Sequence, residues 1–441
     1  MGNKKNVIWI FGDQHRGQML RCNSDFNAVT PNIDNLALTG INFKNAVCGT
    51  PLCCPFRGSL LTGLYTHKCV PGHEYRLPEG QCTIANVFRE NGYKTAYFGK
   101  WHLDGFKENN GRAAFHIVPP ERRGGFEHWV GYENNNSQYD CWVHGGEGDA
   151  AFHYQLDGYE TDRLTELLIN YIKESTAAEN NPFFAVLSVQ PPHNPYVAPP
   201  EFSGKYNPDR IRLRPNVPNI PKFREKVRKQ LANVYAMVEN LDWNVGRVRD
   251  TLKKAGVLEN THILFFSDHG DMHGSHGQFH KMTPYEEALR IPFIISGAET
   301  HYNGWRTGET DIPINHVDIA PTTLGLCGIK KPEWMEGTDY SYCRMAGNKH
   351  ENEPDSAYIQ SVLPTGHAHS VNKPWRGLVT KDDWKYVCLP GMPWMLYNLN
   401  EDPYEQINMA FNSAYEGKRK QLNERLKKWV IDTNDDFSIP E

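Results

Sequence analysis

The chain has 441 residues, 39% of them hydrophobic and 22% charged, and a formal net charge of −5. These values exclude a disordered chain and a nucleic-acid binder that works by general charge attraction, although a net charge says nothing of local basic spots. The length suits one large α/β domain, or such a domain with a smaller appendage. No apolar run reaches the length of a membrane span.

The N-terminus, MGNKKNVIWIF, has lysines followed by five apolar residues, which is too short for a signal peptide. We expect a cytoplasmic protein, or a periplasmic or secreted one if a signal was removed before this numbering begins. We expect no nucleic-acid partner and no membrane attachment. The ten cysteines lack a C-x-x-C pair, so most are expected to be free, buried thiols.

Apolar runs and helical patterns alternate along the first three quarters of the chain. Short continuous apolar runs predict strands buried on both faces of a parallel sheet, at residues 6–11, 95–101, 183–189, 262–267 and 292–296. Thr83 is placed to cap a helix that ends at Gly92. These alternating elements predict a doubly wound α/β domain.

The clearest helix follows Pro221 and ends at Gly256. Its apolar residues step by alternating four and three positions: Val227, Leu231, Val234, Val238, Leu241, Val245, Val248 and Leu252. We interpret it as a helix that lies on the sheet, not as a coiled coil. A further helix is predicted at residues 317–328.

The last quarter of the chain has a different pattern. A polar segment with Gly and Pro, residues 344–356, is typical of a linker. Four short apolar runs between residues 356 and 399 then predict an antiparallel meander, and a charged amphipathic helix is predicted near 411–430. We therefore expect a large α/β domain at 1–348 and a small α+β subdomain at 349–441.

Four predicted strands end in polar clusters that could do chemistry. Because the carboxyl ends of parallel strands meet at one edge of a sheet, these clusters predict one site built from distant segments. The residues are Asp13, Gln14, Lys100, His102, His193, Asp268 and His269. The oxygens of Asp13, Gln14 and Asp268 favour Ca²⁺, Mg²⁺ or Mn²⁺. The alternative for any one of them is a structural role, such as a turn residue for Asp13.

The segment PLCCPFRGSLLTG, residues 51–63, is the most specific pattern in the chain. Pro55 fixes the backbone just before a predicted helix, which places Cys53 near a helix N-terminus, where an anion is favoured. Taken alone, Cys53 could equally be a small buried residue.

With this segment the chain resembles the type I sulfatases of the alkaline phosphatase superfamily. Their signature C-x-P-S-R-x-x-x-L-T-G is similar to residues 53–63, and further family motifs match residues 92–103, 192–195, 268–271 and 396–408, with a lysine downstream at Lys281. Two positions depart from the pattern. Phe56 stands where the family usually has Ser or Ala, and Gln14 where it often has Asp, as in related phosphonate and phosphodiester hydrolases.

The resemblance implies an alkaline-phosphatase-like fold: a large mixed sheet flanked by helices, with a small C-terminal α+β subdomain. It also implies that a maturation enzyme oxidises Cys53 to formylglycine. One hydroxyl of the hydrated aldehyde, bound to a divalent metal, attacks sulfur, and the second hydroxyl then drives elimination of sulfate. The implied metal ligands are Asp13, Gln14, Cys53, Asp268 and His269, with Ca²⁺ as the first candidate and Mg²⁺ or Mn²⁺ as alternatives.

The same resemblance assigns the cationic and imidazole side chains. Arg57 holds the formylglycine hydroxylate, and Lys100 and Lys281 bind the sulfate oxygens. His102 is the base of the elimination, and His193 protonates the leaving alcohol.

We therefore predict a sulfatase, with a carbohydrate sulfate favoured as substrate. The alternatives are a phosphonate monoester or phosphodiester hydrolase of the same superfamily, and a non-catalytic binding protein with an unmodified Cys53. Residues 131–146 are rich in Asn, His and aromatic residues, and they predict either a saccharide-binding loop with Trp142 stacked on a sugar, or a plain surface loop. Residues 366–370 are a second candidate for reaching the cleft.

Overall fold

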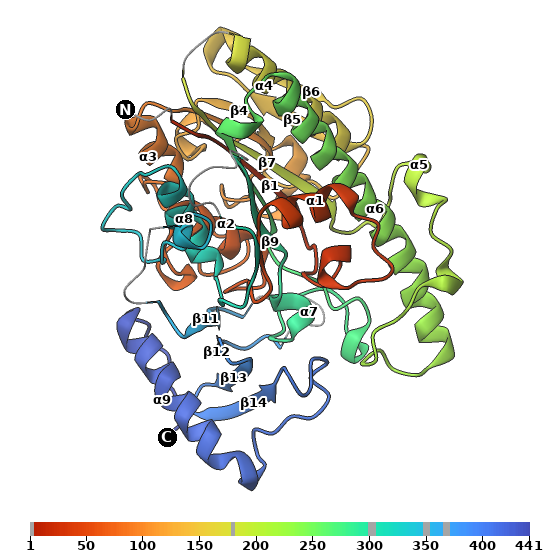
Figure 1. The fold of residues 1–441 in the computed structure, drawn as a ribbon, viewed down its shortest axis with the longest axis vertical. Helices are drawn as coiled ribbons and strands as arrows, with labels where there is room; N and C mark the ends of the chain where they lie inside the picture. Colours follow the sequence, from red (N-terminus) through yellow and green to blue (C-terminus); the bar gives the residue numbers. More distant parts are fainter. Residues whose placement is uncertain (1–3, 178–180, 299–305, 347–352, 365–370) are drawn as a thin grey trace.

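The computed structural model describes residues 4–177, 181–298, 306–346, 353–364 and 371–441. These residues form a large mixed sheet between two layers of helices and a small antiparallel sheet beside it (Figure 1). Among the described helices, none is both long and apolar enough to cross a membrane. The predicted α/β class with a C-terminal α+β part is confirmed.

The large sheet has ten strands in the order β10-β2-β9-β8-β1-β7-β3-β4-β5-β6. Its centre is the parallel set β8, β1, β7 and β3, all four of which were predicted. The bounds are β1 Asn6–Asp13, β2 Ile41–Phe43, β3 Lys94–Lys100, β4 His128–Tyr132, β5 Trp142–Gly145, β6 Phe152–Gln155, β7 Phe183–Pro192, β8 Thr261–Ser267, β9 Phe293–Gly297 and β10 Gly308–Thr310.

Helices cover both faces of this sheet, as the continuous apolar strands predict. One face is covered by α2 (Cys53–Thr62), α3 (Ile84–Glu90) and α8 (Ile319–Leu326). The opposite face is covered by α1 (Pro31–Thr39), α4 (Glu160–Ala177) and α6 (Pro221–Lys254). Two short helices, α5 (Pro200–Ser203) and α7 (Glu286–Leu289), lie in connections.

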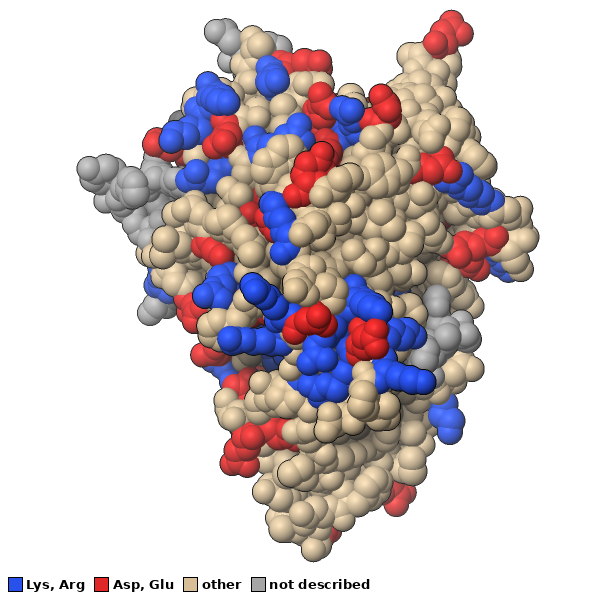
Figure 2. All heavy atoms as spheres, turned by 90° about the vertical axis from the view of Figure 1, so that its right-hand side faces the viewer, with Lys and Arg blue, Asp and Glu red and all other residues tan. Residues whose placement is uncertain are grey.

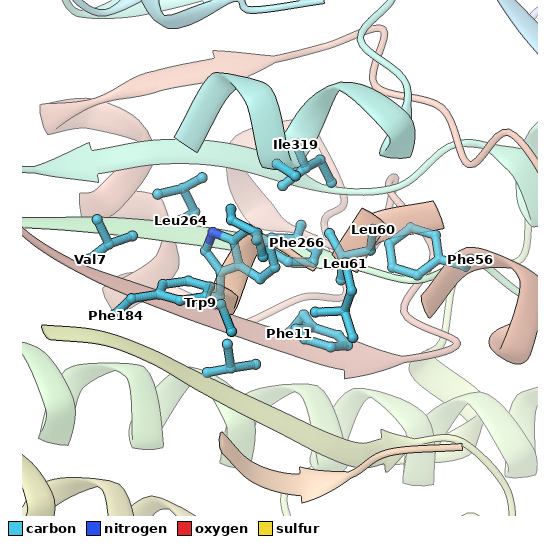
Figure 3. Close-up of a cluster of buried hydrophobic side chains, with 14 of the residues drawn as sticks. Val7, Trp9, Phe11, Phe56, Leu60, Leu61, Phe184, Leu264, Phe266 and Ile319 are labelled. Atoms are coloured by element: carbon cyan, nitrogen blue, oxygen red, sulfur yellow. The ribbon is translucent and has the colours of Figure 1, made fainter. Parts of the chain in front are cut away.

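Alternate side chains of the central strand β1 pack against the helices on opposite faces of the sheet. Trp9 and Phe11 point toward α2 and α8, where they meet Leu61 and Ile319 (Figure 3). Ile8 and Ile10 point the other way and pack with the apolar stripe of α6. All four β1 side chains are at most 1% exposed, so β1 is fixed in the middle of the molecule. The polar residues that follow β1 are fixed with it.

Two local predictions need correction. The helix of the signature segment begins at Cys53 itself, so Pro55 lies inside its first turn and not before it. A proline is tolerated there because the first backbone N–H groups of a helix have no partner within the helix. Residues 131–146 are not simply a loop, since β5 lies there and continues the sheet antiparallel to β4.

The small sheet has the predicted meander order, β11 (Ser356–Ser361), β12 (Trp375–Thr380), β13 (Trp384–Leu389) and β14 (Met392–Asn398), and α9 (Glu416–Asp432) packs on it. The boundary predicted between residues 348 and 349 lies outside the described residues and stays a prediction.

A buried ion cluster joins the small sheet to the large one. Lys385 of β13 is fully buried, and its ammonium contacts the carboxylates of Glu405 and of Glu286, the latter at 3.2 Å. Glu286 is the first residue of α7 and also pairs with Arg290 at 2.7 Å. Without the Lys385 ammonium, Glu286 would still pair with Arg290, but the buried carboxylate of Glu405 would lose the cation that it contacts.

We expect Lys385→Met to lower the free energy of unfolding by about 3–5 kcal/mol, because it breaks a buried ion cluster by removing one partner. The control is Lys381→Met, which removes an exposed pair with Glu353 and should cost at most about 1 kcal/mol. Urea unfolding of both variants measures the difference. Equal losses would mean that the cluster does not hold the small sheet in place.

Candidate active site

The carboxyl ends of four central strands meet at one edge of the large sheet, as predicted. Asp13 ends β1, Lys100 ends β3, His193 follows β7 and Asp268 follows β8. Close approach of β3 to β7 helps to place Lys100. The preceding Gly99 has φ of +105°, and a side chain there would collide with the carbonyl oxygen of Ser188.

The thiol of Cys53 lies at the centre of these strand ends. Cys53 is the first residue of α2 and is 3% exposed. Its Sγ lies 3.5 Å from Asp13 Oδ1 and 3.2 Å from His269 Nε2, and it accepts a hydrogen bond from Lys281 Nζ at 3.0 Å. The residue predicted to carry the chemistry therefore touches predicted metal ligands and a predicted sulfate-binding lysine at once.

Phe56, one of the two departures from the family pattern, does not enter this space. Its ring is buried in the core, 5.0 Å from the ring of His316. The side chain of Phe56 therefore packs in the core and does not line the pocket above Cys53.

Three buried cations surround the carboxylate of Asp13. Its Oδ2 lies 2.8 Å from Lys100 Nζ and 3.3 Å from the Arg57 guanidinium, and its Oδ1 lies 3.9 Å from Lys281 Nζ. Burial raises the pKa of Asp13, but Lys100 and Lys281 outweigh this and hold the pKa well below its ordinary value. Burial and the negative charge of Asp13 raise the pKa of Asp268 to about 6. Two buried carboxyl groups thus lie side by side, an arrangement that a divalent cation would stabilise.

The donor atoms fit such a cation. Ligand atoms of Asp13, Cys53, Asp268 and His269 all lie within 4.8 Å of one another. Gln14 donates from Nε2 to Asp271 at 2.6 Å, which leaves its buried Oε1 without a hydrogen-bond partner among the described residues. An unsatisfied buried amide oxygen is costly unless something binds it, so Oε1 of Gln14 is available as a further oxygen ligand.

The ring of His269 is held with one nitrogen on the backbone and the other facing the candidate cation site. Its Nδ1 lies 3.0 Å from the carbonyl oxygen of Gly270, which can only accept, so Nδ1 carries the proton. The lone pair of Nε2 therefore faces Cys53 and the carboxylates. Burial lowers the pKa of His269, which favours the neutral ring that metals bind.

The two other predicted histidines differ in their partners. His193 donates from Nδ1 to the carbonyl oxygen of Asn194 at 2.7 Å, so its Nε2 is the free nitrogen. Neither ring nitrogen of His102 has a hydrogen-bond partner in the described part of the chain. Burial, then the charge of Lys281 for His193 and of Lys100 for His102, lowers the pKa of each well below its usual value. Both rings are therefore neutral before a negative substrate enters.

Backbone strain is concentrated at this edge of the sheet. Gln14 has φ of 70° and His102 has φ of 56°, in the left-handed region that costs most residues free energy. Hydrogen bonds hold both: the Gln14 N–H donates to Asp268 at 2.9 Å, and the His102 N–H donates to Glu133 at 2.7 Å. Strained backbone held in this way is typical of functional sites.

A pocket of about 330 Å³ opens above Cys53. It brings together six of the predicted site residues and several that were not predicted. The predicted ones are Gln14, Cys53, Lys100, His102, His193 and Lys281. Those not predicted are Leu52, His73, Glu108, Asn134, Asn136, Asn194 and His280. The other four predicted residues lie below the pocket. Asp13 and His269 contact Cys53, and Arg57 contacts both the backbone of Lys100 and the carboxylate of Asp268.

The residues that were not predicted carry a weak signal in the sequence. Asn134 and Asn136 belong to the segment suspected of binding saccharide, and both donate to Glu108. Trp142 does not line the pocket, since its ring packs on Phe115 and His153. Residues 366–370 lie outside the described residues.

A thiol at a helix N-terminus, set between a carboxylate pair and buried cations, is an arrangement suited to hydrolysis of an ester of a tetrahedral oxyanion. The comparison with known families makes this specific. The family model described as Sulfatase matches residues 5–329, and that of the N-sulphoglucosamine sulphohydrolase C-terminal region matches residues 274–432. The chain belongs to the sulfatase family and is a sulfuric ester hydrolase. Members of this family use a metal ion and a formylglycine.

Individual relatives agree. The ulvan-active sulfatase of Formosa agariphila is 34% identical over 98% of this chain and 82% of its own. The N-acetylglucosamine-6-O-sulfatase of Bacteroides thetaiotaomicron is 24% identical over 96% of this chain and 86% of its own. Among solved structures, the YidJ protein of Bacteroides fragilis has a TM-score of 0.86 at 28% identity, and covers 98% of this chain and 97% of its own.

Proposed function

We propose that this sulfatase removes sulfate from a carbohydrate, using a formylglycine made from Cys53 and a divalent ion at the carboxylate pair. The observation that carries the proposal is the position of Cys53, whose Sγ contacts Asp13, His269 and Lys281 on the floor of a pocket of about 330 Å³. Named relatives that act on carbohydrate sulfates support the substrate class.

The metal ligands in this proposal are Asp13, Gln14, Asp268, His269 and the modified residue 53. Ca²⁺ is the first candidate, because carboxylate and amide oxygens dominate the set, with Mg²⁺ and Mn²⁺ as alternatives. When bound, the ion supplies charge stabilisation and a more acidic hydroxyl at residue 53. The maturation enzyme that makes formylglycine is the protein partner we propose.

The remaining side chains act on charge and protons. Lys100 and Lys281 lie in the pocket wall, where they can meet the sulfate oxygens. Arg57 is 1% exposed and ties Asp13 to the backbone of Lys100, so it holds the floor rigid around residue 53. The negative charge of a bound sulfate ester favours the protonated ring of His193, whose Nε2–H can then donate to the leaving oxygen. His102, whose ring nitrogens have no hydrogen-bond partner among the described residues, can accept a proton in the step that releases sulfate.

The test of the proposal is a parallel assay of a carbohydrate sulfate, a phosphodiester and a phosphonate monoester, in which release of the alcohol is measured for each ester. Higher kcat/KM on the sulfate supports the proposal. Higher kcat/KM on either phosphorus ester would replace it with the phosphonate monoester or phosphodiester hydrolase.

His193→Ala should harm sugar sulfates far more than nitrophenyl sulfate. A sugar alkoxide is a poor leaving group and needs a proton, whereas nitrophenolate leaves without one. One acid catalyst contributes about 10² to 10⁴ in rate, so kcat/KM for the sugar ester should fall by that factor. Steady-state kinetics on both esters measures the gap.

The matched variant is His102→Ala. His102 acts after the alcohol has left, so its loss should slow turnover of both esters alike. An equal loss on the two esters for His193→Ala would mean that His193 only binds sulfate and that another group supplies the proton.

A further inference from the structure

One face of this acidic protein is strongly basic. Residues 205–229 carry nine basic side chains and two acidic ones, in a chain with a net charge of −5. Figure 2 shows Lys and Arg gathered across the middle of the face that carries the first turns of α6. We call this surface the basic face. Its basic residues are Lys205, Arg210, Arg212, Arg214, Lys222, Arg224, Lys226, Arg228 and Lys229.

Much of this charge is not used inside the protein. Lys205, Arg214 and Lys229 pair with Glu239, Glu287 and Glu225. Within the described part of the chain, no carboxylate pairs with the other basic side chains of the face. The exposed members of that unpaired set are Arg210, Arg212, Lys222 and Lys226.

The fold does not require these charges. Along α6 Phe223 and Val227 belong to a buried apolar cluster, while Lys222 and Lys226, one turn apart, are exposed. Like charges at this spacing destabilise a helix slightly. The first turn of α6 also has no acidic residue, so the positive end of the helix dipole adds to the field. The face is therefore suited to an anionic partner.

The face is also hollowed. A cavity of about 280 Å³ is lined by Arg16, Phe26, Arg212, Arg214 and Tyr404, among others. Phe26 is 66% exposed, with the Arg212 guanidinium 5.5 Å from its ring centre. An aromatic ring beside guanidinium groups can meet the apolar face of a sugar and its sulfate at the same time.

This surface reaches the rim of the catalytic pocket. Phe279 packs on Phe223 with ring centres 5.5 Å apart, and the Lys226 ammonium lies 4.6 Å from its ring centre. The next residue, His280, lines the pocket above Cys53. A chain seated on the basic face would thus lead to the place where sulfate is removed.

We propose that the basic face is a docking surface for an extended sulfated polysaccharide, one unit of which enters the catalytic pocket. The choice of polyanion rests on the proposed function. If the neighbouring pocket hydrolyses a sulfate ester of a carbohydrate, a sulfated polysaccharide is the polyanion that comes to this surface. It adds a binding site outside the pocket, with Arg210, Arg212, Lys222 and Lys226 as its exposed charges.

The experiment compares two variants of the full chain with equal net charge. The first replaces Arg210, Arg212, Lys222 and Lys226 with Gln. The control replaces four Lys near or on α9, away from the basic face. The control positions are Lys381, Lys420, Lys427 and Lys428. Each changes the net charge from −5 to −5 − 4 = −9. Binding of a heparin oligosaccharide and hydrolysis of nitrophenyl sulfate are measured for both.

We expect the Kd for heparin to rise about tenfold or more in the first variant and to change less than about twofold in the control, because local charge, not net charge, binds the polyanion. The kcat/KM for nitrophenyl sulfate should stay unchanged in both.

Equal weakening of heparin binding in the two variants would overturn the docking surface. Equally tight binding of single-stranded DNA of matched charge would overturn its assignment to sulfated polysaccharide. Absence of sulfate hydrolysis in the unaltered protein would count against the proposed function alone, since heparin binding still decides the surface.

Discussion

Cys53→Ala is expected to abolish turnover and leave the protein folded. The substitution removes the Sγ atom that contacts Asp13, His269 and Lys281, and with it the group that we propose as the source of the nucleophile. Loss of a covalent nucleophile should lower kcat by about 10⁴-fold or more. Sulfate release on a carbohydrate sulfate measures the loss, and an unchanged melting temperature shows that the fold remains.

The matched control is Cys54→Ala, one residue along α2. Cys54 is fully buried, burial raises its pKa, and its Sγ lies 3.9 Å from the ring of His73, so it is an inert thiol beside the pocket. We expect this variant to keep most activity. Mass spectrometry of the peptide should show an aldehyde at residue 53 and a thiol at residue 54. An active Cys53→Ala and an inactive Cys54→Ala would reverse the assignment of the nucleophile.

The second large effect concerns the metal. Asp13→Asn and Asp268→Asn should each lose the bound ion and lower kcat by about 10³-fold or more, because the ion contributes several kcal/mol to the reaction. Chelation of the unaltered protein should remove activity, and Ca²⁺, Mg²⁺ or Mn²⁺ should restore it. Elemental analysis of the purified variants measures the ion directly.

Asp271→Asn gives a graded comparison. Asp271 accepts from Gln14 Nε2 and aims its Oε1, so its loss should weaken metal affinity by about 10- to 100-fold without abolishing binding. Full activity of metal-free protein would contradict the metal assignment. A loss of the ion in Asp271→Asn as complete as in Asp13→Asn would instead show that Gln14 carries more of the binding than the carboxylates.

The sequence predicts the central sheet and the floor of the site for a common reason. Strands buried on both faces leave long apolar runs, and the polar residues that end them, such as Asp13, Lys100 and Asp268, must converge at one edge. The edge strand β6 left no such signal, since most of its side chains are exposed. Glu108 and His73 of the pocket wall were missed because tertiary packing brings them there and no local pattern encodes it, whereas Asn134 lies in the segment suspected of binding saccharide.

The burial of Cys53 sets an order of events. Its neighbours come from residues 13, 269 and 281, so the walls around it close only after most of the chain is available to pair. Pairings between such distant segments form slowly. Before that closure, residues 51–63 are accessible to another enzyme, whereas in the folded chain Cys53 is 3% exposed. If Cys53 is converted to formylglycine as proposed, the conversion would compete in time with folding, and a chain that folded first would keep an inactive thiol.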